Sequence, residues 1–520
     1  MYIYYRFLSM LSSNKAIVGL LVIVNLSTTS LFSQKTSFPN TADGRKEVEI
    51  INSNSMSYMN TSIGEVRFLS GEVKIKHEKT YMECDSAIIY MNTKTVHAFG
   101  HVYINNNDSL DIYCDMAKYT GTDKLVSLFY HVVMLNGKLR LESPEVFYDL
   151  NTSIGNYYKT GIVINETTKI TSKKGIYYSH SADVYFRDEV VVTDPKFKMT
   201  TDTLQYNTNR DLATFYSRTT IVGDNSTIYC YSGHYDTKKQ LADFGTNTLI
   251  DTKTQQLFTD SLYYDRNNGI AKTYKFFVFK DLENKVNMTG TKAVYREENK
   301  YLFAWQRPLL VNFEEKDSIY IKADTIVSFA QDSSDKRFFY GYRNVKMFRK
   351  DLQAKCDSIY YSYIDSSFKM FYQPVLWSEN MQITGDTIFL LTKDNKADEL
   401  RVNGNGFITM QSTKSYFDQL KGNHIIGYLK NNSIETMNIE GNAESIYFVK
   451  DDTNNSLTGS NKSSCTRMKL FFLDKKVEKV KFMGKPDATF TPINKLTAEL
   501  KTLKGYSWQD DIRPKSKEDL

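Results

Sequence analysis

A unit of about 29 residues recurs along most of this chain, and that period constrains the fold more than any other feature of the sequence. A fixed period predicts a stack of structural units in which each unit contacts mainly its neighbours. Such a stack offers a long surface or groove more readily than a single catalytic pocket. The clear copies begin at Cys84, Cys114, Ser143, Ser172, Thr201, Cys230 and Thr259, and looser or degenerate copies begin at Gly290, Ala323, Cys356, Gly385, and near Phe417 and Cys465.

Residue types alternate at intervals of two inside each unit, which is the period of a β-strand rather than a helix. When the first residue is counted as position zero, position zero is always small and position one is often Asp. A second extended run follows a polar turn, and position sixteen is mostly polar, which predicts a corner or an exposed edge. Position five forms an aromatic column of Tyr119, Tyr148, Tyr177, Tyr206, Tyr235, Tyr264, Tyr295 and Tyr361.

Positions twelve, fourteen, eighteen and twenty form apolar columns, and position twenty is apolar in all seven clear copies. This face is either buried or lines an apolar ligand. Abundant Tyr, Phe and β-branched residues with few prolines favour strands, so the sequence predicts an all-β stack of antiparallel strands. The column residues are Val96, Ala98, Val102, Ile104, Val126, Leu128, Val132, Met134, Val163, Val184, Phe186, Val190, Val192, Phe215, Phe244, Ile221, Ile250, Phe277 and Phe279.

The sequence divides into four segments. Residues 1–33 have a basic residue, a short apolar run and small residues, which predicts a secretory signal peptide, with an uncleaved anchor as the alternative. Residues 45–290 form the regular repeat region, and residues 291–490 form a looser continuation with longer units. Residues 491–520 form a charged tail that we expect to be loosely ordered.

No constellation of residues predicts catalysis, a cofactor or a metal site. The five cysteines all occupy position zero, so we interpret them as small buried residues, although a Cys84–Cys114 disulfide stays open. We expect the Asp at position one to bond to backbone amides of a turn rather than to bind calcium. The tyrosine column is expected to stabilise the sheet, with sugar or base binding as the alternative. A net charge of +6 is too small to indicate a partner.

The pattern small–Asp–x–apolar–x–Tyr, a polar turn and a run holding Gly-x-Val resembles the repeat of the OstA/LptA family. It occurs here as residues 84–90 with Gly100-His-Val102, Gly161-Ile-Val163 and Gly71-Glu-Val73. The resemblance covers roughly residues 45–490 and is greatest to the long OstA-like proteins of Bacteroidetes-type bacteria. Their last repeat resembles residues 465–486, and their short tail resembles residues 508–515.

The resemblance implies a periplasmic two-sheet β-jellyroll with a V-shaped groove, in which the column residues contact acyl chains of lipopolysaccharide. It also implies that the protein transports this lipid from the inner to the outer membrane. Edge strands at the ends of the stack would join the protein to other transport components. Nucleic acid and a transmembrane span after signal cleavage are not expected. Two rivals stay open: a structural or adhesive β-solenoid with a filled interior, and a carbohydrate-active β-helix enzyme with converging acidic residues.

Overall fold

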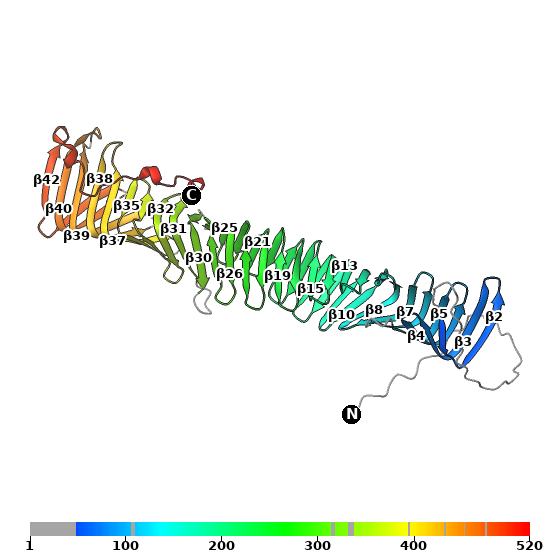
Figure 1. Cartoon of the computed structure of the whole chain (residues 1–520). Helices are drawn as coiled ribbons and strands as arrows, with labels where there is room; N and C mark the ends of the chain where they lie inside the picture. Colours follow the sequence, from blue (N-terminus) through cyan, green and yellow to red (C-terminus); the bar gives the residue numbers. More distant parts are fainter. Residues whose placement is uncertain are drawn as a thin grey trace, which may run out of the picture.

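The computed structural model describes residues 48–105, 110–313, 318–330, 337–393, 396–430, 433–451, 453–473 and 476–520. They form 42 strands, and four short 3-10 helices follow near the C-terminus. The strands stack into one elongated body that runs from β2 to β42 (Figure 1). The predicted all-β antiparallel fold is confirmed. The signal peptide predicted at 1–33 lies outside the described residues.

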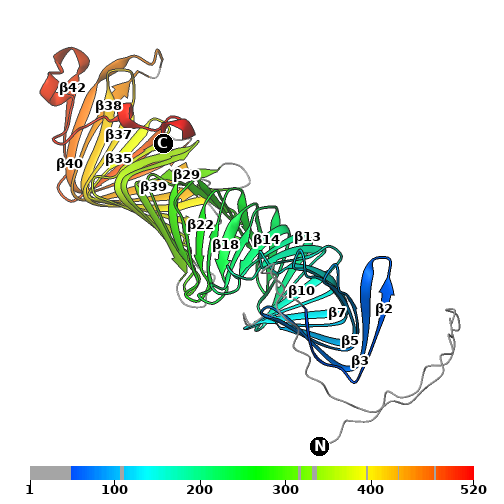
Figure 2. The same ribbon diagram turned by 45° about the vertical axis from the view of Figure 1, so that its right-hand side comes forward.

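The stack has two sheets that meet along a corner, as Figure 2 shows most clearly at the β2 end. We call them the leading sheet and the trailing sheet, because each repeat enters the first before the second. Long strands bend at the corner and contribute to both sheets: β3 (Gly64–His77), β4 (Thr80–Tyr90), β5 (Thr95–Asn105), β6 (Leu110–Thr120), β7 (Leu125–Asn136), β8 (Leu139–Asp149), β13 (Asp183–Asp194), β14 (Phe197–Asn207), β31 (Arg337–Arg349), β32 (Leu352–Ser362), β37 (Lys396–Gln411), β38 (Phe417–Lys430), β39 (Ser433–Lys450) and β40 (Leu457–Leu473).

Elsewhere the chain breaks at the corner, and shorter strands belong to one sheet each. The leading sheet holds β2 (Ser55–Thr61), β9 (Ile154–Tyr157), β12 (Lys174–Tyr178), β15 (Leu212–Phe215), β18 (Gly233–Asp236), β19 (Leu241–Phe244), β22 (Leu262–Asp265), β23 (Ile270–Thr273), β26 (Lys292–Arg296), β27 (Tyr301–Trp305), β30 (Thr325–Ala330), β33 (Ser367–Phe371), β36 (Thr387–Lys393) and β41 (Lys476–Met483). The trailing sheet holds β1 (Glu49–Asn52), β10 (Gly161–Asn165), β11 (Thr168–Ser172), β16 (Thr219–Gly223), β17 (Thr227–Cys230), β20 (Thr248–Asp251), β21 (Gln255–Thr259), β24 (Phe277–Asp281), β25 (Val286–Gly290), β28 (Leu309–Asn312), β29 (Ile319–Lys322), β34 (Val375–Ser378), β35 (Met381–Thr384) and β42 (Asp487–Pro492).

The corner falls at position sixteen of the repeat, where the sequence predicted it. In β5 the pairing register shifts between Phe99 and Val102, and the two intervening residues, Gly100 and His101, both have positive φ. Two consecutive residues in the left-handed region turn a strand sharply, and glycine adopts that conformation without steric cost. Position zero of the next unit pairs directly after this bend, as Cys114 does with Val102. A small side chain fits there because the two sheets converge.

The aspartate at position one bonds across the corner in several units. Asp85 accepts a hydrogen bond from Nδ1 of His101 at 2.8 Å, and Asp115 accepts one from His131 at 2.8 Å. The expectation of a backbone partner holds for Asp260, which accepts from the amide of Asn247 at 3.2 Å. At the histidine corners the partner is instead a side chain sixteen residues further on.

The apolar side chains between the sheets form two large clusters. One extends from Val48 to Ala271 and the other from Phe277 to Leu470, with Leu257 and Tyr295 packed against both. The core therefore changes from one cluster to the next in the middle of the stack. This change coincides with the hollow described below.

The charged tail is not loosely ordered, and that expectation was wrong. Residues 493–520, which we call the strap, contain η1 (Ile493–Lys495), η2 (Ala498–Leu500), η3 (Asp510–Ile512) and η4 (Lys517–Asp519). The strap runs back from the β42 end, so the C-terminus lies beside β31 and β32 (Figure 1). Lys322 Nζ in β29 donates to the Leu520 carbonyl oxygen at 3.0 Å, and Lys346 Nζ in β31 donates to that of Asp519 at 2.7 Å.

Buried glutamines hold the strap on the outer face of the trailing sheet. Gln419 donates to the Lys501 carbonyl at 2.8 Å and accepts from the Leu503 amide at 2.8 Å. Gln382 binds the backbone of Ser507 and Gln509 in the same way, at 2.7 Å each. A two-way bond to backbone needs no particular strap side chain, which is why composition alone did not reveal this docking.

Candidate functional site: an apolar hollow between the sheets

The structure places the nineteen column residues between the two sheets. Seventeen of them are buried, and Ile221 and Ile250 are partly buried. Five of the nineteen line the two cavities described below: Ile221 and Phe244 line one, and Ile250, Phe277 and Phe279 line the other. The other fourteen do not line either of these two cavities.

The interior of the earlier repeats is closed by hydrogen bonds between the sheets. Asn136 in the trailing sheet donates to the Tyr177 hydroxyl in the leading sheet at 2.7 Å, and Asn165 donates to Tyr206 at 2.9 Å. His77 and the Tyr119 hydroxyl form a third such pair. We call these three pairs the cross-sheet latches. Burial raises the pKa of Tyr177 and of Tyr119 to about 12, so both hydroxyls stay protonated at neutral pH.

Large side chains also fill this closed section. Tyr157 is buried, and its hydroxyl bonds to Ser172 Oγ at 2.7 Å. A Cβ atom on Gly161 or Gly175 would stand within 2.3 Å of the Tyr157 ring, so both positions need glycine. The interior is therefore packed with protein between about residues 84 and 206, as cores generally are.

The latches stop in the middle of the stack. Each asparagine lies 41 residues before its tyrosine, so the next two partners in the series would be Asp194 for Tyr235 and Gly223 for Tyr264. The Asp194 carboxylate instead accepts from the Lys196 amide at 3.0 Å, and among the described residues the buried Tyr235 hydroxyl has no hydrogen-bond partner. Gly223 has no side chain to offer. The tyrosine latches are thus absent here, and Arg266 of the leading sheet joins the open edges instead by donating to the Lys196 carbonyl at 3.1 Å.

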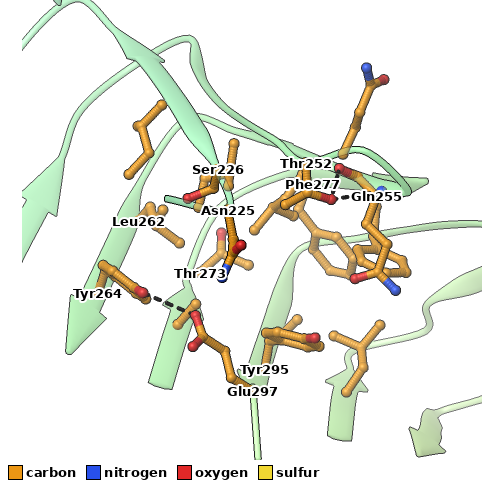
Figure 3. Close-up of a pocket in the computed structure, with 18 residues that line it drawn as sticks. Asn225, Ser226, Thr252, Gln255, Leu262, Tyr264, Thr273, Phe277, Tyr295 and Glu297 are labelled. Carbon is orange, nitrogen blue, oxygen red and sulfur yellow. Dashed lines mark hydrogen bonds between the residues drawn. The ribbon is translucent and has the colours of Figure 1, made fainter. Parts of the chain in front are cut away.

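An apolar cavity of about 240 Å³ lies between the sheets after the latches stop. Its floor consists of aliphatic and aromatic residues of both sheets, including Phe277 of β24 and Leu262 of β22, both of which are labelled among the lining residues in Figure 3. Polar residues form the rim, among them Asn225 and Ser226 from the β16–β17 turn. The full lining is Asn225, Ser226, Ile228, Ile250, Thr252, Gln255, Gln256, Leu257, Leu262, Tyr264, Ala271, Thr273, Phe277, Phe279, Ala293, Tyr295, Glu297 and Leu302.

A second cavity of about 260 Å³ adjoins the first, and we call it the mouth cavity. The two share Asn225, Ser226, Ile228, Tyr264 and Glu297, so they form one continuous hollow. Together they reach the size range of pockets for small organic ligands. The mouth cavity is lined by Phe197, Met199, Ile221, Gly223, Asp224, Asn225, Ser226, Ile228, Tyr235, Ala242, Phe244, Tyr264, Arg266 and Glu297.

The polar groups of the hollow gather at its edge. The Tyr264 hydroxyl donates to Glu297 Oε1 at 3.0 Å (Figure 3), and both residues belong to the leading sheet side of the hollow. Burial, with the nearby Glu297 charge, raises the pKa of Tyr264 far above its ordinary value. Arg266 lies over the Phe197 ring, 5.9 Å from its centre, and donates to the Lys196 carbonyl at 3.1 Å. An apolar floor with a polar, charged edge suits an amphiphile.

Sequence reasoning missed much of this site. It assigned Tyr264 and Tyr295 a role in stabilising the sheet, and it did not select Ala271, Ala293 or the β16–β17 turn. A signal was present: position twenty-two holds Asn136 and Asn165 in two successive closed units, and then Asp194 and Gly223 where the hollow begins. Its partner tyrosine lies two units away, which hides the relation from a comparison within one unit.

The cysteines and the residue types that bind metals form no disulfide or metal site within the described residues. All five cysteines are buried and free, so Cys84 and Cys114 are not joined. Burial raises the pKa of the Cys114 thiol to about 12. Within the described part of the chain no three His, Cys, Asp or Glu residues gather as metal ligands, and no helix is long and apolar enough to cross a membrane.

The fold and the hollow define an elongated two-sheet β-jellyroll with an apolar interior. Residues 45–202 match the model of the family described as OstA-like protein, which supports an OstA/LptA-type assignment for this part of the chain. No curated protein matches the chain. The matched region covers the latched repeats up to residue 202, and apart from Phe197 and Met199 the lining of the hollow lies beyond it, in repeats of the same two-sheet geometry.

Proposed function

We propose that the protein is a periplasmic carrier that binds the acyl chains of lipopolysaccharide in its hollow and bridges their passage from inner to outer membrane. The observation that carries the proposal is an apolar floor exposed through a polar mouth where the latches end. Transfer of each methylene from water to such a floor contributes about 0.8 kcal/mol. The match of residues 45–202 to a family described as OstA-like supports the same proposal, because the resemblance to that family implies lipid transport.

The two ends of the stack support a bridging role. Among the described residues, β1 and β2 pair only with β3 at one end, and β41 and β42 pair only with β40 at the other. Exposed apolar side chains lie on β2, including Met56, Tyr58 and Met59. An unpaired edge of this kind is a template for another strand. We propose that other lipopolysaccharide-transport components pair with these edges.

The rival of a purely structural stack requires a filled interior throughout. The latched section meets that requirement, and the hollow does not. Two carboxylates line the hollow, Glu297 and Asp224, and Glu297 is already engaged by the Tyr264 hydroxyl at 3.0 Å rather than aimed at a substrate with a second acid. We therefore propose a non-enzymatic function.

Site-specific photo-crosslinking in living cells tests the proposal. A photoreactive residue at Ile250 or Ile221 is expected to form adducts with lipopolysaccharide. Val222 is the matched control, because it is adjacent to Ile221 on the same strand but 49% exposed on the outer face. Adducts at Val222 equal to those at Ile221 and Ile250, or no adducts at either interior position, would contradict lipid carriage.

A further inference from the structure

A cavity of about 470 Å³ lies at the outside of the corner where the two sheets meet, and we call it the corner cavity. Its lining comes from β31 to β37 and from the strap, and it shares no residue with the hollow. Gln509 and Ile512 of the strap line it. Because the Gln509 amide donates to the buried Gln382 side chain at 2.7 Å, docking of the strap forms one wall of this cavity.

The chain crosses the corner five times in succession at this cavity, and the residues at these crossings follow a symmetric order. Tyr372 lies at the middle crossing, between β33 and β34. The crossings on either side contribute Asp357 and Asp386, and the crossings beyond them contribute Asn344 and Asn405. Pairing of β31 with β32, β32 with β34, β34 with β35 and β35 with β37 makes the crossings direct neighbours. Since neighbouring strands lie about 4.8 Å apart, the row spans about 19 Å.

The side chains of this row are open to a ligand. Tyr372 is 71% exposed, the largest value for a large hydrophobic residue among those described. Asn344, Asp357, Asp386 and Asn405 are exposed as well. Asp357 accepts from a neighbouring serine hydroxyl at 2.8 Å, and Asp386 accepts from Asn405 Nδ2 at 3.1 Å. A carboxylate has about four acceptor sites, so both aspartates can accept further hydrogen bonds.

Charge and shape narrow the class of ligand. Asp357 and Asp386 outnumber Lys355, the one lysine of the lining, so phosphate groups and nucleic acids are repelled. Aspartate only accepts hydrogen bonds, whereas asparagine both donates and accepts, and hydroxyl groups match both. Sugars also present an apolar C–H face that packs on a tyrosine ring. A β-1,4-linked chain is straight, and about four of its rings cover a row of about 19 Å.

We propose that the corner cavity binds a straight chain of neutral β-1,4-linked sugars, with one ring stacked on Tyr372. Asp357 and Asp386 accept hydrogen bonds from hydroxyls of that ring and its neighbours, and the two asparagines bond to the rings beyond. Such a site attaches the outside of the rod to a glycan and leaves the space between the sheets free. It does not depend on the proposed lipid binding, because the two sites share no lining residue.

Calorimetric titration of the full chain with three tetrasaccharides tests the site. Cellotetraose and chitotetraose have the straight β-1,4 backbone, without and with acetamido groups, whereas maltotetraose is α-linked and coiled. The better of the two straight chains is expected to bind roughly tenfold more tightly than maltotetraose, and its identity gives the type of sugar. Equal binding of all three, or no binding of either straight chain, would overturn the glycan site.

Variants of Tyr372 locate the binding. Tyr372→Ala removes the ring and is expected to weaken binding of the straight chain roughly tenfold, whereas Tyr372→Phe keeps the ring and stays within about twofold of the wild-type affinity. Tyr130→Ala is the matched control: Tyr130 lies at the β7 corner with a φ of 62° against 61° for Tyr372, and it is 62% exposed outside the corner cavity. An equal loss in Tyr130→Ala, or no loss in Tyr372→Ala, would contradict the proposal. Lipid adducts at Ile250 are expected to stay unchanged in Tyr372→Ala, so failure of the glycan site and failure of lipid carriage are told apart.

Discussion

The repeats before residue 206 and those after residue 221 share one fold but treat their interior differently. In the earlier repeats, asparagine or histidine at one open edge bonds to tyrosine at the other, and Tyr157 fills the space behind. In the later repeats the tyrosines persist while their partners change to Asp194 and Gly223. A change of one side chain per unit thus coincides with the change from a closed core to an open hollow. In such a stack, the positions that depart from the repeat therefore distinguish the candidate site from the closed core.

The largest expected effect comes from restoring the missing latch. A Cβ at Gly223 would meet only the carbonyl oxygens of Ser226 at 3.6 Å and Lys196 at 3.9 Å, which is ordinary contact. Gly223→Asn is therefore tolerated and places an amide opposite Tyr264. We expect lipid adducts at Ile250 to fall at least tenfold, measured by photo-crosslinking. Gly223→Ala has no amide and is the control; an equal loss there would show that bulk alone, not the latch, blocks the hollow.

A pH titration distinguishes the stability of the C-terminal strands from that of the latched repeats and of the repeats around the hollow. Burial raises the pKa of Asp418 in β38 to about 6, although its carboxylate accepts a hydrogen bond from the Phe448 amide at 2.7 Å. Because the folded-state pKa exceeds the unfolded value, the folded protein binds the extra proton between about pH 4 and 6. This group therefore favours the folded state at low pH, and its contribution falls by about 2–3 kcal/mol as pH rises through 6. Chemical unfolding at pH 4.5 and 7.5 measures the difference.

Asp418→Asn is the matched variant for that titration. It is neutral at every pH and is expected to lose the pH dependence of this step. A local probe placed in the latched repeats should report no such pH-dependent change in stability, either in the wild-type protein or in the variant. A step of unchanged size in Asp418→Asn would assign it to another group.

Breaking a latch should make a closed repeat resemble the open ones. Tyr177→Phe removes the hydroxyl that accepts from Asn136. The free energy of unfolding is expected to fall by about 1 kcal/mol, because one buried hydrogen bond is lost and the amide is left without this partner. Denaturant unfolding measures this change. Tyr178→Phe, on the adjacent outward position of β12, is the control; an equal loss there would show that the latch contributes nothing.

The smallest expected effect is no difference at all. Burial raises the pKa of Cys114 in a latched repeat and of Cys230 beside the hollow to about 12 in each case. Both lie at the corner, which stays closed in the two regions. We expect negligible reaction of either cysteine with a thiol reagent at pH 8 until denaturant is added. Mass spectrometry measures the extent of labelling. Fast labelling of Cys230 alone would mean that the hollow extends to the corner.

Much of the fold followed from period and alternation, because each repeat must bury the same positions against its neighbours. Positions twelve, fourteen, eighteen and twenty pointed inward, and position sixteen marked the bend, as at Gly100 and Asp188. The hollow could not be predicted from the repeat. Whether a column residue is buried, like Val163, or partly open, like Ile250, depends on contacts between the two sheets that join residues 41 positions apart in the sequence. The strap was hidden for a related reason: Gln382 and Gln419 recognise its backbone, and charged side chains gave no sign of it.

The returning strap has a consequence for how the molecule can be labelled. Because Leu520 lies against β29, a label attached at Leu520 sits beside β29 and leaves the β42 edge accessible to a partner. The strap also covers the outer face over Trp377 and Gln382, so detachment of the strap would uncover both of these buried side chains.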